Sequence, residues 1–171
     1  MRFAVNYLAG FLLTRLLLPM LERRKSARIV NVSSAGQQAI DFSDVMLTRG
    51  YSGVRAYRQS KLAQILFTFD LAKELEERDV TVNCLHPATY MDTTMVRLSR
   101  VQPISTVEQG GAAILQLIES EALAGRSGLY FSGMQESRAD RQAYDEGARL
   151  RLRALSFDLV DLPDPLAGPA N

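Results

Sequence analysis

Apolar side chains recur along much of the chain at the three-to-four-residue spacing of an α-helix. This pattern predicts helices over residues 3–24, 56–78, 106–120 and 139–155. The first of these is apolar on more than one face, which is typical of a buried helix. Residues 138–153 carry charges of both signs, and we expect them to form a solvated helix.

Short runs rich in β-branched residues separate these helices. Residues 28–33, 80–85 and 128–131 predict three strands, so strand, helix and strand follow one another in the middle of the chain. That order favours parallel strands joined by a right-handed crossover. We expect an irregular segment over residues 37–54, one domain over residues 1–160, and a flexible tail over residues 161–171, where prolines accumulate.

Composition fits a globular domain and excludes several classes of function. The 171 residues are 47% hydrophobic and 23% charged, and the net charge at pH 7 is +1. A charge so close to zero does not favour nucleic acid as a partner. Cys84 is the single cysteine, so an internal disulfide is impossible. We expect no metal site, because the sequence has no cluster of zinc-type ligands, and a reducing cytoplasm as the location.

The apolar stretch over residues 8–21 raises the question of a membrane segment. Thr14 and Arg15 interrupt it, and it falls short of the roughly 20 apolar residues that a membrane-spanning helix needs. A basic stretch follows, without a cleavage site of small residues. We therefore expect neither a signal peptide nor a membrane span.

Hydroxyl, phenol and ammonium groups follow one another where a strand ends and a helix begins. Ser33 and Ser34 close the strand, and Tyr57 and Lys61 lie four residues apart, on one face of the predicted helix. A phenol with a pKa of about 10 is a poor acid at neutral pH, but an adjacent cation favours its anion. A serine hydroxyl can stabilise an oxygen that gains negative charge. Together these groups suit interconversion of a carbonyl and an alcohol.

Five segments resemble the short-chain dehydrogenase/reductase family in the family's order, most closely its branch of retinol-dehydrogenase-like and WW-domain-oxidoreductase-like members. They are FAVNYLAGFLLT at 3–14, RIVNVSS at 28–34, YRQSKLA at 57–63, VTVNCLHP at 80–87 and GRSGLYF at 125–131. The resemblance covers about residues 1–155. It implies an α/β fold, a Rossmann-like doubly wound parallel sheet with helices on both faces, truncated at the N-terminus.

The resemblance also implies roles for individual residues. Tyr57 would donate or accept the proton, and Lys61 would lower its pKa and bind the nicotinamide ribose. Ser34 would polarise the substrate oxygen, with Ser33 as the fallback. Asn6 would hold a water of the proton relay through its helix backbone. The cofactor would be NAD or NADP, a choice that the sequence does not reveal.

Further cofactor contacts are implied at the strand ends, by Asn31, Pro87, Ala88 and Thr89 together with Tyr57 and Lys61. The family has Pro-Gly where this chain has Pro87-Ala88. A backbone with positive φ would be costly at Ala88, so we expect a local shift there. His86, the single histidine, suits a structural role beside Pro87 better than a catalytic one.

The larger departure is that no Gly-x-x-x-Gly-x-Gly loop occurs in the sequence. In doubly wound folds that loop binds the pyrophosphate of the dinucleotide. We therefore weigh three hypotheses. The first is an NAD(P)-dependent oxidoreductase acting on a small carbonyl or alcohol substrate, as a homodimer or homotetramer. The second is a non-catalytic relative that dimerises or binds a partner, and the third is a fragment of a longer enzyme.

Overall fold

The computed structural model of the chain describes residues 1–167. Its elements follow the order of the predicted ones, with several short additions. They are η1 (Ala4–Leu8), α1 (Ala9–Leu21), β1 (Ala27–Val32), α2 (Gly53–Glu74), β2 (Val80–His86), α3 (Thr94–Leu98), α4 (Val107–Glu119), η2 (Glu121–Leu123), β3 (Tyr130–Ser132), β4 (Gln135–Ser137), η3 (Arg141–Tyr144) and α5 (Glu146–Leu159).

The sheet is parallel except at one edge. Its strand order is β1-β2-β3-β4, with β1, β2 and β3 parallel to one another. The crossover of β1, α2 and β2 was predicted, and the register of its two strands begins with Ala27 opposite Val80. The antiparallel β4 was not predicted, because its three residues are exposed and carry no apolar pattern. It follows a tight turn at Gly133, whose φ of 58° favours glycine.

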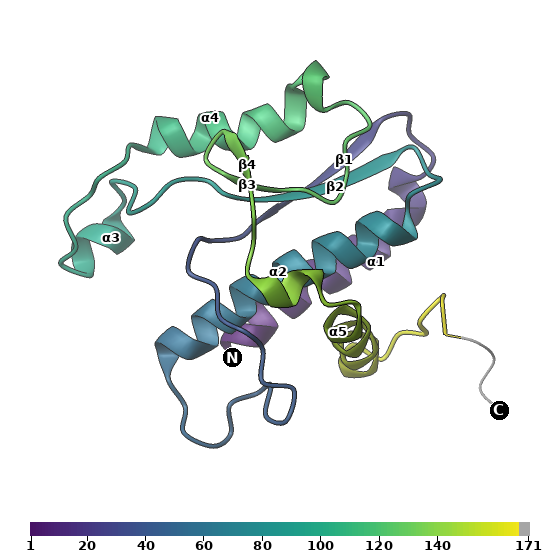
Figure 1. Cartoon of the computed structure of the whole chain (residues 1–171), viewed down its shortest axis with the longest axis horizontal. Helices are drawn as coiled ribbons and strands as arrows, with labels where there is room; N and C mark the ends of the chain where they lie inside the picture. The colour runs from purple at the N-terminus through teal and green to yellow at the C-terminus, as the bar shows by residue number, and fades with distance from the viewer. Residues whose placement is uncertain (168–171) are drawn as a thin grey trace.

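Helices cover both faces of the sheet, as expected for a doubly wound fold. Figure 1 shows α4 on one side of the strands and α1, α2 and α5 on the other. Successive residues of β2 serve the two layers: Cys84 belongs to the core beneath α2, and Leu85 to the smaller core beneath α4. The core beneath α2 includes Leu62 and Leu66, which are fully buried. Each such side chain contributes roughly 1.5–3 kcal/mol by leaving water.

Side-chain caps fix where α2 and α4 begin. Ser52 caps α2 by accepting a hydrogen bond from the Arg55 N–H. Thr106 and Gln109 form a reciprocal capping box at the start of α4, which confirms the predicted opening turn of that helix. These caps satisfy N–H groups that otherwise lack partners at a helix start.

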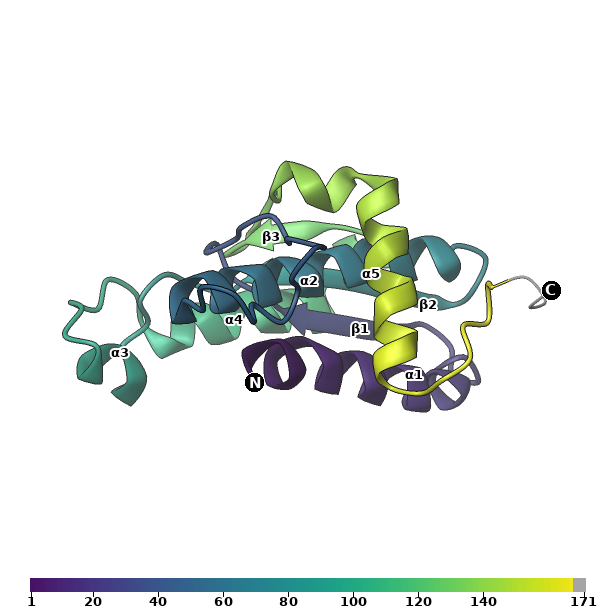
Figure 2. The ribbon, with the colours of Figure 1, turned by 90° about the horizontal axis from the view of Figure 1, so that it is seen from below.

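The helix α5 crosses α1 and α2, as Figure 2 shows. The Phe157 ring lies 5.1 Å from the Phe11 ring, and the Tyr7 hydroxyl hydrogen bonds with Ser156 Oγ at 2.7 Å. The prediction of a solvated helix over residues 138–153 was wrong in part, because Arg153 is 5% exposed. A charge pattern shows no exposure by itself, and here the guanidinium is buried against carboxylates of α2.

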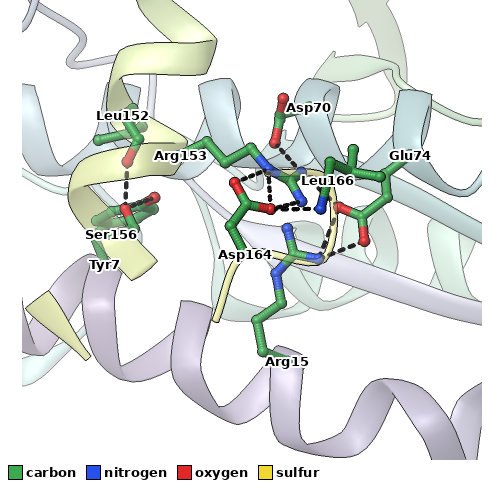
Figure 3. Close-up of polar contacts among 9 residues, drawn as sticks. All are labelled: Tyr7, Arg15, Asp70, Glu74, Leu152, Arg153, Ser156, Asp164 and Leu166. Carbon is green, nitrogen blue, oxygen red and sulfur yellow. Dashed lines mark hydrogen bonds and ion pairs between the residues drawn. The ribbon is translucent and has the colours of Figure 1, made fainter. Parts of the chain in front are cut away.

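Five charged residues from three helices and the segment after α5 meet where α5 packs on α2. We call them the guanidinium cluster: Arg15, Asp70, Glu74, Arg153 and Asp164 (Figure 3). Arg153 donates to carboxylates of all three acids. Asp164 thereby connects residues beyond α5 to the core. Flexibility of residues 161–171 stays a prediction, and residues 168–171 of that segment lie outside the described residues.

The outer side of the first helix is apolar and exposed. Val5, Leu13, Leu16 and Met20 are 66%, 58%, 62% and 54% exposed. The helical stretch Ala4–Leu21 is long and apolar enough to cross a membrane by length and composition, with a mean hydropathy of 1.5 and 22% of its residues buried. Core helices of soluble proteins meet the same criterion, so the expectation of no membrane span stays a prediction.

Candidate active site

The candidate site lies at the carboxyl end of β1, beside the first turns of α2. β1 ends at Val32, and the two serines follow directly. In open parallel sheets, ligands bind outside the carboxyl ends of the strands. The predicted residues therefore lie where this class of fold places its ligands.

Tyr57 and Lys61 lie on the same side of α2, as their spacing predicted. The Lys61 ammonium nitrogen is 5.9 Å from the centroid of the Tyr57 ring. It donates to the Val32 carbonyl at 3.0 Å and to Gln64 Oε1 at 3.1 Å. Partial burial lowers the pKa of Lys61 below its usual value. Within residues 1–167, the Tyr57 hydroxyl has no hydrogen-bond partner, so it is free to bond a ligand.

The structure separates the two serines that the sequence left as alternatives. Ser33 is buried, and its hydroxyl donates to the Lys61 carbonyl at 2.7 Å. Ser34 Oγ accepts a hydrogen bond from the Gly36 N–H at 3.0 Å, which leaves its own proton to donate. A β-carbon built on Gly36 would lie 3.5 Å from Ser34 Oγ and 3.6 Å from Tyr57 Cε1. Ser34 and the Tyr57 ring thus flank the same small space, and Gly36 keeps it open.

Asn6 approaches the site from the other helix. It lies in the π-helical turn η1, where the Ala9 N–H bonds to the Ala4 carbonyl five residues back. Its side-chain nitrogen donates to Ser60 Oγ at 3.0 Å, and Ser60 Oγ donates to the Tyr57 carbonyl at 2.7 Å. Isolated π-helical turns occur frequently at functional sites. The structure therefore connects Asn6 to the turn that carries Tyr57.

The residues expected to contact a cofactor lie at the ends of β1 and β2. The Asn31 amide donates to Thr68 Oγ1 at 2.9 Å, so this side chain is engaged with α2. Pro87 and Ala88 follow β2, and Thr89 Oγ1 is hydrogen bonded to His86 Nε2 at 2.8 Å. Their contact with a cofactor stays a prediction.

The backbone at Ala88 avoids the positive φ that would be costly there, in keeping with the expected local shift. Ala88 is not among the residues of positive φ in the described part of the chain, whereas Tyr90, two residues later, has a φ of 44°. The positive φ of this loop falls on Tyr90, an exposed residue. The methyl group of Ala88 therefore adds no cost of the kind expected.

Two further groups that could react, Cys84 and His86, lie in β2. Burial raises the pKa of the Cys84 thiol to about 12, so it stays protonated at neutral pH. Burial also lowers the pKa of His86, which favours a neutral ring that bonds with Thr89. Among residues 1–167, no group of three or more histidine, cysteine, aspartate or glutamate side chains is placed to hold a metal ion.

Sequence reasoning missed three residues that shape this site: Gly36, Ser60 and Gln64. Gly36 keeps the space beside Ser34 open, Ser60 bonds with Asn6, and Gln64 holds Lys61. A signal existed for Gln64 and for Ser60, since each lies one helical turn from a candidate residue. None existed for Gly36, whose role depends on a loop.

Among curated proteins, the chain is similar in sequence to retinol dehydrogenases. The chain is 38% identical over 183 residues to retinol dehydrogenase 13 of Homo sapiens and 37% identical over 174 residues to retinol dehydrogenase 11 of Mus musculus. These alignments cover 96% and 95% of this chain. They cover 55% of either relative, so the chain spans about half the length of the curated relatives it matches.

Solved structures share the fold. A protein of Mycobacterium paratuberculosis without an assigned function superposes with a TM-score of 0.72 at 30% identity, covering 96% of this chain and 60% of that one. The NADPH-bound carbonyl reductase from chicken fatty liver gives a TM-score of 0.59 at 26% identity, covering 80% and 53%. A family model described as short chain dehydrogenase matches residues 2–103, which is more than half of the sequence. The chain therefore belongs to the short chain dehydrogenase family.

Proposed function

We propose that this chain carries the catalytic part of an NAD(P)-dependent oxidoreductase that interconverts a small carbonyl compound and an alcohol by hydride transfer. The observation that carries the proposal is that Ser34 and the Tyr57 ring both border Gly36, near the carboxyl end of β1, with the Lys61 ammonium 5.9 Å from the centroid of that ring. Family membership and the NADPH-bound carbonyl reductase among the similar structures support it.

The residues present fit the nicotinamide and ribose part of such a cofactor. An ammonium has three N–H groups, and the described structure gives two of those of Lys61 an acceptor. The third is available to a ribose hydroxyl, as is the hydroxyl of Tyr57. The sequence contains no glycine-rich loop for the pyrophosphate, so the fit extends to this part of the cofactor alone.

A bound nicotinamide would supply or accept the hydride. In the reducing direction, the Ser34 hydroxyl donates a hydrogen bond to the carbonyl oxygen, and Tyr57 transfers its hydroxyl proton to that oxygen as negative charge develops. The Lys61 ammonium stabilises the resulting phenolate. In the oxidising direction Tyr57 takes the proton back from the alcohol.

The proposal is tested by titrating the purified chain with NADH and with NADPH while following cofactor fluorescence. We expect saturable binding that Lys61→Ala weakens by about tenfold or more, because a charge-assisted hydrogen bond of about 1.5–3 kcal/mol is lost. Lys73→Ala is the matched control, since Lys73 lies on the same helix and pairs with Glu146 at the surface. No binding by a folded chain up to millimolar cofactor would contradict the proposal for this chain.

Tyr57→Phe separates binding from chemistry. We expect the affinity for NADPH to stay within about threefold and reduction of a carbonyl substrate to fall by about 10²–10⁴-fold, the usual contribution of a positioned acid. Unchanged turnover in Tyr57→Phe would assign the proton transfer to another group.

A second candidate function is a module that dimerises or binds a partner. The exposed apolar side chains of the first helix, Val5, Leu13, Leu16 and Met20, favour it, because a patch of this kind often marks an interface. The inner face of α1 meets α5 through Phe11 and Phe157, so a homodimer would use the outer face of the first helix. Light scattering of the chain and of Leu13→Lys/Leu16→Lys tests this: a dimer that the substitutions dissociate supports it, and a monomer opposes homodimerisation.

A further inference from the structure

Ser60 lies within the Tyr57-to-Lys61 segment and has no role in the proton transfer described above. Its side chain is fully buried in α2. Its hydroxyl accepts from Asn6 Nδ2 at 3.0 Å and donates to the Tyr57 carbonyl at 2.7 Å. The hydroxyl is therefore used both as acceptor and as donor, and the Asn6–Ser60 bond joins residues that are 54 positions apart in the sequence.

The link joins two turns whose relative position matters to the site. One is the π-helical turn η1 with Asn6, and the other is the first part of α2 with Tyr57. The neighbouring contacts between these helices are aromatic: the Tyr7 and Phe67 rings lie 6.3 Å apart. Ring contacts tolerate sliding, whereas a hydrogen bond requires donor and acceptor within about 3.2 Å and nearly in line. The Arg15–Glu74 pair fixes the far ends of the two helices, and the Asn6–Ser60 bond fixes the register where the two turns lie.

We propose that Ser60 is a positioning residue, which holds the turn of Asn6 at a fixed place against the turn of Tyr57. The inference rests on the proposed function, in which Tyr57 transfers the proton. Ser60 touches neither substrate nor cofactor and acts through Tyr57 and Asn6. Catalytic groups must be held within about 0.5 Å of their productive positions by neighbours that are themselves fixed.

The test compares Ser60→Ala with Ser156→Ala. Both replace a fully buried serine whose hydroxyl donates to a backbone carbonyl of its own helix and bonds to a side chain of the first helix. Ser156 bonds with Leu152 and with Tyr7, which neighbours Asn6 in η1, but neither bond reaches the turn of Tyr57. The two variants thus lose similar interactions, and only Ser60→Ala breaks the link to the site.

The first readout is NMR of the chain without cofactor. The ring signals of Tyr57, assigned with Tyr57→Phe, are expected to shift in Ser60→Ala and to keep their positions in Ser156→Ala. Exchange of the Asn6 side-chain amide protons is expected to accelerate by about tenfold in Ser60→Ala, since their acceptor is gone. Unchanged Tyr57 and Asn6 signals in Ser60→Ala, or equal shifts in both variants, would overturn the proposal.

The second readout uses the complete reaction. Ser60→Ala is expected to lower kcat of carbonyl reduction by about tenfold with KM within about threefold, because binding groups remain while the proton donor is misplaced. A chain that binds no NADPH, but whose Tyr57 signals respond to Ser60→Ala alone, would refute the proposed function and retain the link. A normal kcat in Ser60→Ala would refute the positioning role while leaving the function intact.

Discussion

The candidate site and the guanidinium cluster both use residues of α2. They differ in which hydrogen-bonding groups remain available to a ligand. The candidate site uses its first turns through Tyr57 and Lys61, and the guanidinium cluster uses its last turns through Asp70 and Glu74 (Figure 3). Both are partly buried and rich in charge or hydroxyl groups. Sequence patterns singled out the first and gave no sign of the second.

In the guanidinium cluster the two arginines and the three acids form ion pairs with one another. Arg15 donates to both oxygens of Glu74 at 2.7 and 2.8 Å, and Arg153 donates to Asp70, Glu74 and Asp164 at 2.6–3.0 Å. Aromatic faces supplement the acids, since the guanidinium carbon of Arg15 lies 4.8 Å from the ring centroid of Phe157 and packs over two further rings. Arg15 Nε and Nη2 are buried and have no hydrogen-bond partner within residues 1–167, so the rings supply part of what the acids do not. The burial of the paired charges points to a structural role.

The candidate site, in contrast, keeps hydrogen-bonding groups that can still bond a ligand. The Tyr57 hydroxyl lacks a partner in the described part of the chain, Lys61 keeps an N–H to donate, and Ser34 keeps its proton. The comparison teaches that charges paired out of reach of solvent serve the fold, whereas a reactive site is marked by partly exposed groups that can still bond a ligand. Substitutions in the two sites are ranked below by the unfolding free energy that each is expected to cost.

The largest effect on stability is expected for Arg153→Met. It leaves three carboxylates without their common cation, and removing one partner of a buried ion pair typically costs about 3–5 kcal/mol. Urea unfolding followed by circular dichroism measures the loss of unfolding free energy. Lys73→Met is the control, because the Lys73–Glu146 pair is exposed, and it is expected to unfold at the midpoint of the unmodified chain. Equal midpoints for both variants would show that burial does not distinguish the pairs.

A smaller effect, dependent on pH, is expected for Asp164→Asn. Burial opposes ionisation of Asp164, but hydrogen bonds from Arg153 and from the Leu166 N–H outweigh it, so the pKa lies below its usual value. A depressed carboxyl pKa stabilises the fold above the unfolded-state pKa of about 4, and this stabilisation is lost as pH falls through the folded value. We expect a loss of about 1–3 kcal/mol at pH 7 that shrinks below pH 4.

Asp70 is expected to show the opposite dependence of unfolding free energy on pH. Burial is the main cause of its raised pKa, although Arg153 opposes the shift. Because the folded state binds this proton more tightly than the unfolded state, Asp70 favours folding increasingly as pH falls through its folded pKa. The stability of Asp70→Asn relative to the unmodified chain should therefore decline on acidification. Urea midpoints between pH 3 and 7 that move in parallel for both variants would contradict the assignment.

A still smaller effect on stability is expected for Lys61→Met. Burial disfavours the charge of Lys61, as its lowered pKa shows, and this offsets much of what its hydrogen bonds to Val32 and Gln64 contribute. We expect a loss of no more than about 1 kcal/mol by urea unfolding, against about 3–5 kcal/mol for Arg153→Met. A loss as large as that of Arg153→Met would make Lys61 primarily structural.

The smallest effect on stability is expected for Tyr57→Phe. The substitution removes a hydroxyl that has no partner in residues 1–167, so the unfolding free energy should stay within about 0.5 kcal/mol. Thermal unfolding measures it, with Tyr7→Phe as the control, because the Tyr7 hydroxyl bonds with buried Ser156 and its loss should cost about 1 kcal/mol or more. A destabilised Tyr57→Phe beside an unchanged Tyr7→Phe would reverse this ranking.

Much of the central fold could be predicted because its signals are local. Helical spacing and β-branched runs predicted β1, α2 and β2, and Thr106 predicted the start of α4. Tyr57 and Lys61 lie close together because they are four residues apart on one helix, so no tertiary contact is needed to bring them together. The resemblance to the short-chain dehydrogenases depends on the same continuous segments and was confirmed by the family comparison.

What lay beyond prediction depends on contacts between segments far apart in the sequence. β4 has no apolar alternation, and it exists because Gly133 turns the chain back along β3. Likewise the burial of Arg153 depends on Asp70 and Asp164, which a charge pattern along α5 does not contain.

The amino-acid sequence by itself determined the parallel strand–helix–strand unit, the start of α4 and which candidate groups share a helix face, because these follow from periodicity and local hydrogen bonding. The tertiary structure alone decided that Ser34 rather than Ser33 borders the open space, that Asn6 bonds to Ser60, and that the apolar first helix keeps one side exposed. Each of these depends on contacts between two elements, and the free energy of such contacts cannot be assigned to either element alone.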